Sequence, residues 1–183
     1  VSTIMNLPPI IQGGMGVAIS GWELAGAVSG QGSLGVVSGT AISHRMIARL
    51  MKGDVGGHVR RALDQFPFQD PVKGILDRYF VPEGESKEGA FRSPTMWTIE
   101  PPRSLDALVA IANFVEVTLA REGHDNPVGI NLLEKVQLPN LASLYGAMLE
   151  RVRMTGADVD GILWYQGESD GMDNNASKAY EDK

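Results

Sequence analysis

Residues 8–38 read PPIIQGGMGVAISGWELAGAVSGQGSLGVVS, and this stretch decides the fold class. The apolar residues 10–12 predict a short strand that runs into the glycine turn GGMG at 13–16. Residues 22–28 have the small and apolar side chains of a short helix, and residues 32–38 predict a second, buried strand. A strand, a glycine loop, a helix and a strand within about thirty residues form a βαβ unit, whose two strands are parallel.

A helical period follows this unit, over residues 42–63. The residues expected on its buried face are Met46, Ile47, Leu50 and Met51, and those expected on the opposite face are Arg45, Arg49 and Lys52. Glycines at positions 53, 56 and 57 interrupt the period, so we expect a break before residue 59.

The rest of the chain continues the alternation of helices and strands. Residues 66–103 are rich in proline and predict a long loop. An amphipathic helix is expected at 105–122, capped by Ser104, and a further helix at 141–154. Strands are expected at 126–133 and 161–167. This order favours an α/β protein with a parallel sheet.

The composition excludes several classes of protein. Of the 183 residues 43% are hydrophobic and 21% are charged, a globular balance, and no apolar run approaches the ~18 residues of a membrane span. A net charge of −6 with scattered basic residues argues against nucleic-acid binding, and the lack of cysteine excludes disulfides and thiolate metal sites.

No secretory signal follows Val1, so we expect a cytoplasmic protein. The missing initiator Met suggests a longer reading frame.

The glycine turn at 13–16 is the first candidate binding feature. It follows the carboxyl end of the first predicted strand, where ligands of parallel α/β folds bind. Glycines let the backbone approach a flat ring or a phosphate, and Met15 offers an apolar contact; the alternative is a tight turn without a ligand. The sequence GQGSLG at 30–35 has dinucleotide-binding spacing, but it closes a helix and enters a strand, so helix-terminating glycines explain it better.

Few side chains are spaced for metal or acid–base chemistry. The three histidines, His44, His58 and His124, have no second ligand at metal-binding spacing, so no metal site is expected. His44 is expected to be exposed in the first turn of its helix, and His124 to lie in a polar turn. Residues 164–170, WYQGESD, place a polar cluster after a predicted strand; it could orient a substrate or only anchor and cap that strand.

The segments PIIQGGMG (9–16), LAGA (24–27) and LGVVS (34–38) resemble the nitronate monooxygenase (2-nitropropane dioxygenase) family, as do VGINLL (128–133) and PNLASLYGAML (139–149). The resemblance covers about residues 5–149 and implies an FMN-dependent (β/α)8 barrel. In that family the glycine–Met turn and the Asn of the third strand lie against the flavin. The cofactor-binding residues implied here are Gly13, Gly14, Met15, Gly16 and Asn131.

After residue 149 the chain resembles another family. SLYGAMLERV (143–152) and GILWYQGESD (161–170) are similar to the sialate O-acetylesterases, carbohydrate esterases of the SGNH-type hydrolase class. Under that resemblance Gln166 and Glu168 would border the catalytic site. We therefore expect two parts, a flavoprotein-like part over 1–149 and an esterase-like part over 150–183.

Both parent enzymes are incomplete in this chain. An eight-unit barrel takes about 250 residues, and the later strands, which carry the catalytic His and most flavin-phosphate contacts in the nitronate monooxygenase family, are absent. The nucleophile block and the Asp-x-x-His of the esterase family are absent too, so acyl transfer lacks its nucleophile and base.

We therefore expect a partial TIM barrel, with the N-terminal βα units only and a fourth strand from the esterase-like segment. The expected function is an inactive fragment of a flavin-dependent oxidoreductase; the alternatives are a carbohydrate O-acetylesterase fragment and a non-functional chimera. The resemblance to the flavoproteins implies that a His base deprotonates a nitroalkane while reduced FMN passes electrons to dioxygen. The expected partners are a small-molecule substrate and a second copy joined through the open sheet edge, with no nucleic acid and no membrane.

Overall fold

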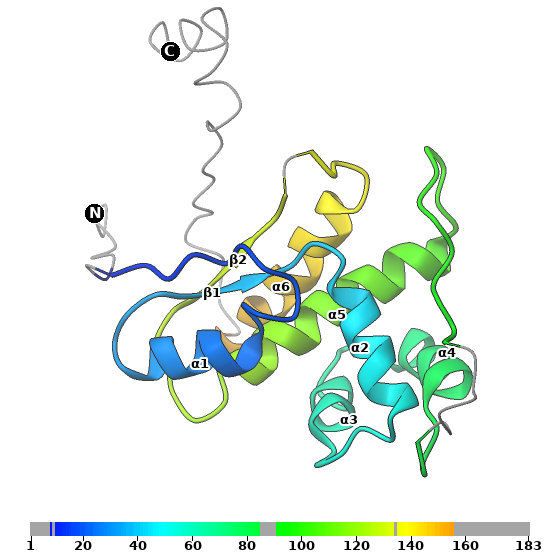
Figure 1. Cartoon of the computed structure of the whole chain (residues 1–183), viewed down its shortest axis with the longest axis horizontal. Helices are drawn as coiled ribbons and strands as arrows, with labels where there is room; N and C mark the ends of the chain where they lie inside the picture. Colours follow the sequence, from blue (N-terminus) through cyan, green and yellow to red (C-terminus); the bar gives the residue numbers. More distant parts are fainter. Residues whose placement is uncertain (1–7, 9, 85–90, 134, 156–183) are drawn as a thin grey trace, which may run out of the picture.

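The computed structural model describes residues 8, 10–84, 91–133 and 135–155. Along these ranges six helices and two strands follow one another, as Figure 1 shows: α1 (Trp22–Gly30), β1 (Gly35–Ser38), α2 (Ile42–Met51), α3 (His58–Leu63), α4 (Gln69–Tyr79), α5 (Arg103–Ala120), β2 (Val128–Asn131) and α6 (Asn140–Thr155). The described chain is thus a mixed α/β structure, and the predicted helix at 22–28 and strands near 32–38 and 126–133 are confirmed.

The sheet is small and parallel. β1 pairs with β2 in the register Gly35 to Val128 through Ser38 to Asn131. The strand expected at 10–12 is reduced to a single parallel bridge between Ile11 and Leu34, with hydrogen bonds from Gln12 N to Leu34 O and from Leu34 N to Ile10 O. The strand expected at 161–167 lies outside the described residues.

Helices α1 and α5 cover one face of this sheet. Val37 of β1 is completely buried there and packs with Ala25 of α1 and Ala120 of α5. Since side chains alternate along a strand, Val36 and Ser38 point to the other face. The turn at 13–16 crosses that second face, next to the strands in Figure 1.

Helix α5 is the centre of the fold, contacting α1, α2, α3, α4 and α6. The predicted helix at 105–122 is confirmed in its position. The prediction that it is amphipathic is wrong, since every residue from Leu108 to Ala120 is buried. The predicted cap is wrong as well: Ser104 lies inside the helix, which starts at Arg103 after Pro102 and has no side-chain cap. Neighbours on several sides bury a helix all round, whatever polar residues it carries.

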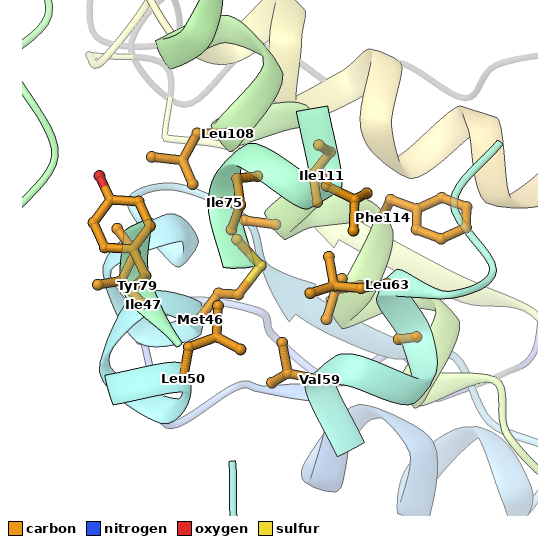
Figure 2. Close-up of a cluster of buried hydrophobic side chains, with 14 of the residues drawn as sticks. Met46, Ile47, Leu50, Val59, Leu63, Ile75, Tyr79, Leu108, Ile111 and Phe114 are labelled. Atoms are coloured by element: carbon orange, nitrogen blue, oxygen red, sulfur yellow. The ribbon is translucent and has the colours of Figure 1, made fainter. Parts of the chain in front are cut away.

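The main hydrophobic core lies where α2, α3 and α4 pack against α5. Figure 2 shows Met46, Ile47 and Leu50 of α2 facing Ile111 and Phe114 of α5 across this core. The apolar face predicted for residues 42–63 is therefore confirmed, as is the glycine interruption that separates α2 from α3. The carboxylate of Asp54, buried in the interruption, accepts hydrogen bonds from the backbone of Val59 (3.0 Å) and Arg60 (2.9 Å) and so caps α3.

The expectation of a long loop over 66–103 is wrong in its first part, because residues 69–79 form α4. Pro71 lies in the first turn of this helix, where its missing N–H would have no partner within the helix. Val72, Ile75 and Tyr79 are buried on one face of α4 and join the core. Between residues 91 and 102 the structure has no helix or strand, in keeping with the predicted loop.

Helices α5 and α6 cross at very short range because of a glycine. A Cβ atom added to Gly146 of α6 would lie 1.9 Å from the carbonyl oxygen of Ala110 in α5. No side chain fits in that space, so the position requires glycine. No helix in the described part of the chain is long and apolar enough to cross a membrane.

Candidate functional site

The turn at 13–16 is held against β1 by Gln12. Its side-chain oxygen accepts a hydrogen bond from the backbone of Val36 (2.9 Å), and its Nε2 donates to the carbonyl of Gly13 (2.6 Å). The hydroxyl of buried Ser20 donates to the same carbonyl over 3.2 Å. The side-chain amide of Gln12 thus connects the extended segment that precedes the turn to β1.

Gly14 lies directly on β1. A Cβ atom added to Gly14 would lie 2.7 Å from Cγ1 of Val36 and 3.0 Å from the carbonyl oxygens of Val36 and Val37. From the neighbouring strand, Nδ2 of Asn131 donates a hydrogen bond to the carbonyl of Gly14 over 3.1 Å. The structure therefore brings the predicted turn and the predicted Asn131 together at the carboxyl ends of the parallel strands.

The surface around this turn is partly apolar. Met15 is 78% exposed and Ile19 is 77% exposed, two large apolar side chains within five residues. The backbone N–H groups from Gly13 to Ala18 donate to no acceptor in the described part of the chain. The turn therefore offers free donors beside an apolar contact surface, which suits a flat, polar-edged ring.

Three further residues shape this site and were not among the predicted site residues: Gln12, Ser20 and Thr40. The hydroxyl of Thr40 accepts a hydrogen bond from the backbone of Leu133 (2.7 Å), and Gly39 N donates to the carbonyl of Asn131 (2.9 Å). Gln12 could have been found from the sequence, since it is a polar residue between an apolar strand and a glycine turn. Ser20 and Thr40 carry no such signal.

The histidines lie apart from one another in the fold. His44 is exposed in the first turn of α2, as predicted, and the ring of His58 lies 5.3 Å from that of Trp22. His124 lies in the predicted turn after α5, half-buried. No group of three His, Asp or Glu side chains in the described ranges is arranged to hold a metal ion. The predicted esterase residues Gln166 and Glu168 lie outside the described residues.

A second polar network lies at the amino end of α1. The carboxylate of Glu116, which is 2% exposed, accepts hydrogen bonds from the backbone of Trp22 (2.8 Å) and from Arg45 (3.2 Å). Glu23 also pairs with Arg45 (2.7 Å) and with Arg49. Burial raises the pKa of Glu116, against the opposing effects of Arg45 and the Trp22 N–H. Burial would raise the pKa of Glu23 too, but its backbone hydrogen bond, Arg45 and Arg49 together lower it.

Comparison with known families gives two matches, one at each end of the chain. The model of the nitronate monooxygenase family matches residues 1–71. The model of the carbohydrate esterases, described as sialic acid-specific acetylesterases, matches residues 128–183. Neither the curated proteins nor the solved structures gave a match.

The two matches confirm the two resemblances and their order along the chain. The turn at 13–16 lies in the segment that is similar to nitronate monooxygenases. Asn131 lies in the segment that is similar to the esterases. Residues 72–127 belong to neither matched range, and a boundary at 149/150 stays a prediction.

Proposed function

We propose that this chain carries the flavin-contacting segment of an oxidoreductase of the nitronate monooxygenase type. The observation that carries the proposal is the hydrogen bond between Asn131 and Gly14, which joins the two predicted flavin-contacting elements at the carboxyl ends of parallel strands. The family match over residues 1–71 supports the same proposal.

Each residue of the turn has a definite part in holding FMN. The unpaired N–H groups of Gly13 and Gly16 would donate to oxygen and nitrogen atoms at the edge of the flavin ring, whereas Gly14, which is buried against β1, would let the turn lie close to the strand. The exposed thioether of Met15 would contact the face of the ring, and Asn131 would keep the turn in place through Gly14. Bound FMN would supply the redox chemistry, which no side chain of the turn can provide.

The parallel bridge from Ile11 to Leu34, with helix α1 between the two residues, further suggests the first βα unit of a (β/α)8 barrel, since all of it lies within the matched residues 1–71. We propose that the 183-residue chain binds flavin without oxidising nitroalkanes, because the turn contains no residue that could act as a base. The histidines lie elsewhere: His44 and His58 are on helices α2 and α3, and His124 precedes β2.

A flavin titration tests the binding. FMN is added to the full chain while its fluorescence and its absorbance band are followed. Saturable quenching of the fluorescence at one FMN per chain is the expected result. A chain that leaves the FMN spectrum unchanged at millimolar flavin contradicts the proposal. The second part is tested by oxygen consumption with 2-nitropropane, where bound FMN and no turnover are expected.

The match over residues 128–183 favours a second candidate function, a carbohydrate O-acetylesterase fragment. Gln166 and Glu168 would then contact substrate. Release of nitrophenol from an aryl acetate is the test: turnover that falls in both Gln166→Ala and Glu168→Ala would support this candidate. No hydrolysis above the background rate, together with FMN binding, would favour the flavin segment.

A further inference from the structure

The amino end of α1 is capped by a residue of another helix. Helix α1 begins at Trp22, after Gly21, which has no side chain to offer as a cap. The backbone N–H of Trp22 donates instead to the carboxylate of Glu116 over 2.8 Å, and Glu116 lies 94 positions later, within α5. A helix leaves the N–H groups of its first turn without partners, and an oxygen at this end stabilises it. Glu116 supplies that oxygen.

Gly21 leaves the space that this contact needs. A Cβ atom added to Gly21 would lie 1.6 Å from Nη1 of Arg45 and 2.9 Å from Oε1 of Glu116. The backbone of Gly21 is extended, a conformation open to any residue, so the close approach alone requires glycine. A buried carboxylate is unfavourable unless it is paired and hydrogen-bonded. Glu116 meets both conditions, because Arg45 lies 3.2 Å away, and its position is therefore well defined.

Ser20 connects the capped end of α1 to the glycine turn. It lies two positions before Trp22, and it bonds to both ends of the turn: its hydroxyl donates to the carbonyl of Gly13 (3.2 Å) and its backbone N–H to the carbonyl of Gly16 (2.8 Å). The carbonyl of Ser20 accepts from Ser38 N of β1 (2.8 Å). A shift of the amino end of α1 would therefore move Ser20, and with it the two carbonyls of the turn.

A second buried carboxylate has the same capping role away from the turn. Asp54, which is 3% exposed, accepts from the backbone N–H groups of Val59 and Arg60 at the start of α3. Neither Val59 nor Arg60 bonds to Ser20 or to the turn within the described ranges. The effect of losing a helix cap can therefore be separated from the effect of moving the turn.

We propose that Glu116 is a positioning residue of the flavin-binding turn, which it holds in place through Trp22 and Ser20. The inference rests on the proposed binding of FMN by this turn. A turn already held in its bound conformation loses less conformational entropy when the ligand binds, so its affinity is higher. Such a coupling is reciprocal: bound FMN must stabilise the contact between Glu116 and Trp22 by the same factor.

Hydrogen exchange of the wild-type chain tests this coupling. Amide protons at a helix end exchange with solvent when their hydrogen bonds open locally. Exchange is followed by NMR of the 15N-labelled full chain, with and without saturating FMN. FMN should slow the exchange of the Trp22 amide about tenfold, a factor that corresponds to one hydrogen bond. The Val59 amide, which is bonded to Asp54, should exchange at an unchanged rate.

The outcomes distinguish this inference from the proposed function. FMN that binds and leaves Trp22 exchange unchanged, or slows Val59 equally, overturns the inference and leaves the proposed function standing. A chain that binds no FMN overturns both. This measurement needs no variant, so it decides the question even if a substitution at Glu116 prevents folding.

Three variants test the same coupling through the affinity for FMN, measured by fluorescence titration at a temperature where each is folded. Glu116→Ala removes the cap and should weaken FMN binding about tenfold. Glu116→Gln keeps an oxygen for the Trp22 N–H, and Arg45 keeps its pair with Glu23, so this variant should bind FMN as the wild-type chain does. Asp54→Ala is the matched control: it should lower the midpoint of thermal unfolding, as Glu116→Ala does, without weakening FMN binding.

Equal FMN affinity in Glu116→Ala and the wild-type chain would overturn the inference. So would equal weakening in Asp54→Ala, which would assign the effect to lost stability. A Glu116→Gln chain that binds as poorly as Glu116→Ala would likewise overturn it, because the capping oxygen is then not what positions the turn.

Discussion

The side-chain amide of Asn131 donates a hydrogen bond over 3.1 Å to the carbonyl oxygen of Gly14, a residue 117 positions earlier in the chain. Asn131 is the last residue of β2, and Gly14 rests on the neighbouring strand β1. This contact therefore ties the candidate flavin-binding turn to β2, while the side chain of Gln12 holds the turn against β1. The arrangement makes Asn131 a positioning residue for the turn, in addition to any contact with a ligand.

Replacing Asn131 by Ala should weaken FMN binding about tenfold, because the turn loses its tie to β2. The unfolding free energy should fall by about 1 kcal/mol, the usual contribution of one hydrogen bond. Asn126→Ala is the control: Asn126 also donates to a backbone carbonyl, that of Ser29 (2.8 Å), before the opposite end of β2. Fluorescence titration and urea denaturation measure the two effects. Equal loss of FMN binding in both variants would mean that general destabilisation causes it.

Gly146→Ala should destabilise the chain by about 1–3 kcal/mol, because the new methyl group must push α6 away from α5. Gly74→Ala is matched to it, since Gly74 also lies within a helix, α4, but has nothing within 4 Å of an added Cβ. That second change should stabilise the chain by about 0.5–1 kcal/mol through helix propensity alone. Urea denaturation of both variants gives the comparison. A stabilising Gly146→Ala would contradict the close crossing of the two helices.

Glu116 should make stability depend on pH in a definite direction. Since burial raises its pKa above the ordinary value of 4.5, the folded chain holds this proton more tightly than the unfolded chain does. The contribution of Glu116 to the free energy of unfolding is therefore complete below about pH 4.5, and it is lost as the pH rises through the raised pKa. Glu23, whose pKa is lowered, acts in the opposite sense, and its contribution is lost as the pH falls.

Glu116→Gln should remove the part of this pH dependence that belongs to Glu116, because the amide stays neutral and still accepts from the Trp22 N–H. The difference in unfolding free energy between the wild-type chain and the variant, measured by urea denaturation from pH 4 to pH 8, cancels the effect of Glu23. Glu122→Gln, the same substitution in the exposed pair with Arg61, is the matched control. Identical curves for wild type and Glu116→Gln would refute the assignment.

Among the described residues, no strand pairs with the outer side of the segment at Ile11, which is 56% exposed and bridges to Leu34 on its other side. We expect the chain to self-associate through this edge, since unpaired strand edges pair with other chains. Ile11→Lys should lower the association constant measured by sedimentation. Leu24→Lys places the same charge on the exposed face of helix α1 and should leave association unchanged. A chain that stays monomeric at all concentrations would argue against an interface at this edge.

The local periodicity of the sequence predicted most helices and the parallel sense of the strands. It failed at α4, because prolines usually mark loops and the position of Pro71 within a first turn cannot be recognised before the helix itself is known. It failed for the surroundings of α5 for another reason. The sequence predicted an amphipathic helix over 105–122, but helices from distant parts of the chain bury even its polar residues Asn113, Glu116 and Thr118.

The family resemblance supplied the residues of the candidate site, whose role in binding stays a prediction, but it did not supply their contacts. Family resemblance pointed to the glycine turn and to Asn131, and the structure brings them together. The contacts of Gln12 and Ser20 depend on how the turn folds back over β1, and the contact of Thr40 depends on how the segment after β2 lies beside the end of β1. No spacing in the sequence records these tertiary relationships.

The ladder between β1 and β2 also joins the two ranges of the chain that are similar to different families. β1 lies in the range matched by the flavoprotein family, and β2 in the range matched by the esterases. Ladder hydrogen bonds are made by the backbone, so an incoming strand needs only apolar residues at alternate positions, which Val128 and Ile130 supply. Genetic recombination between the two families could therefore preserve a parallel sheet while replacing its sequence, and a fused gene could inherit a folded core at once.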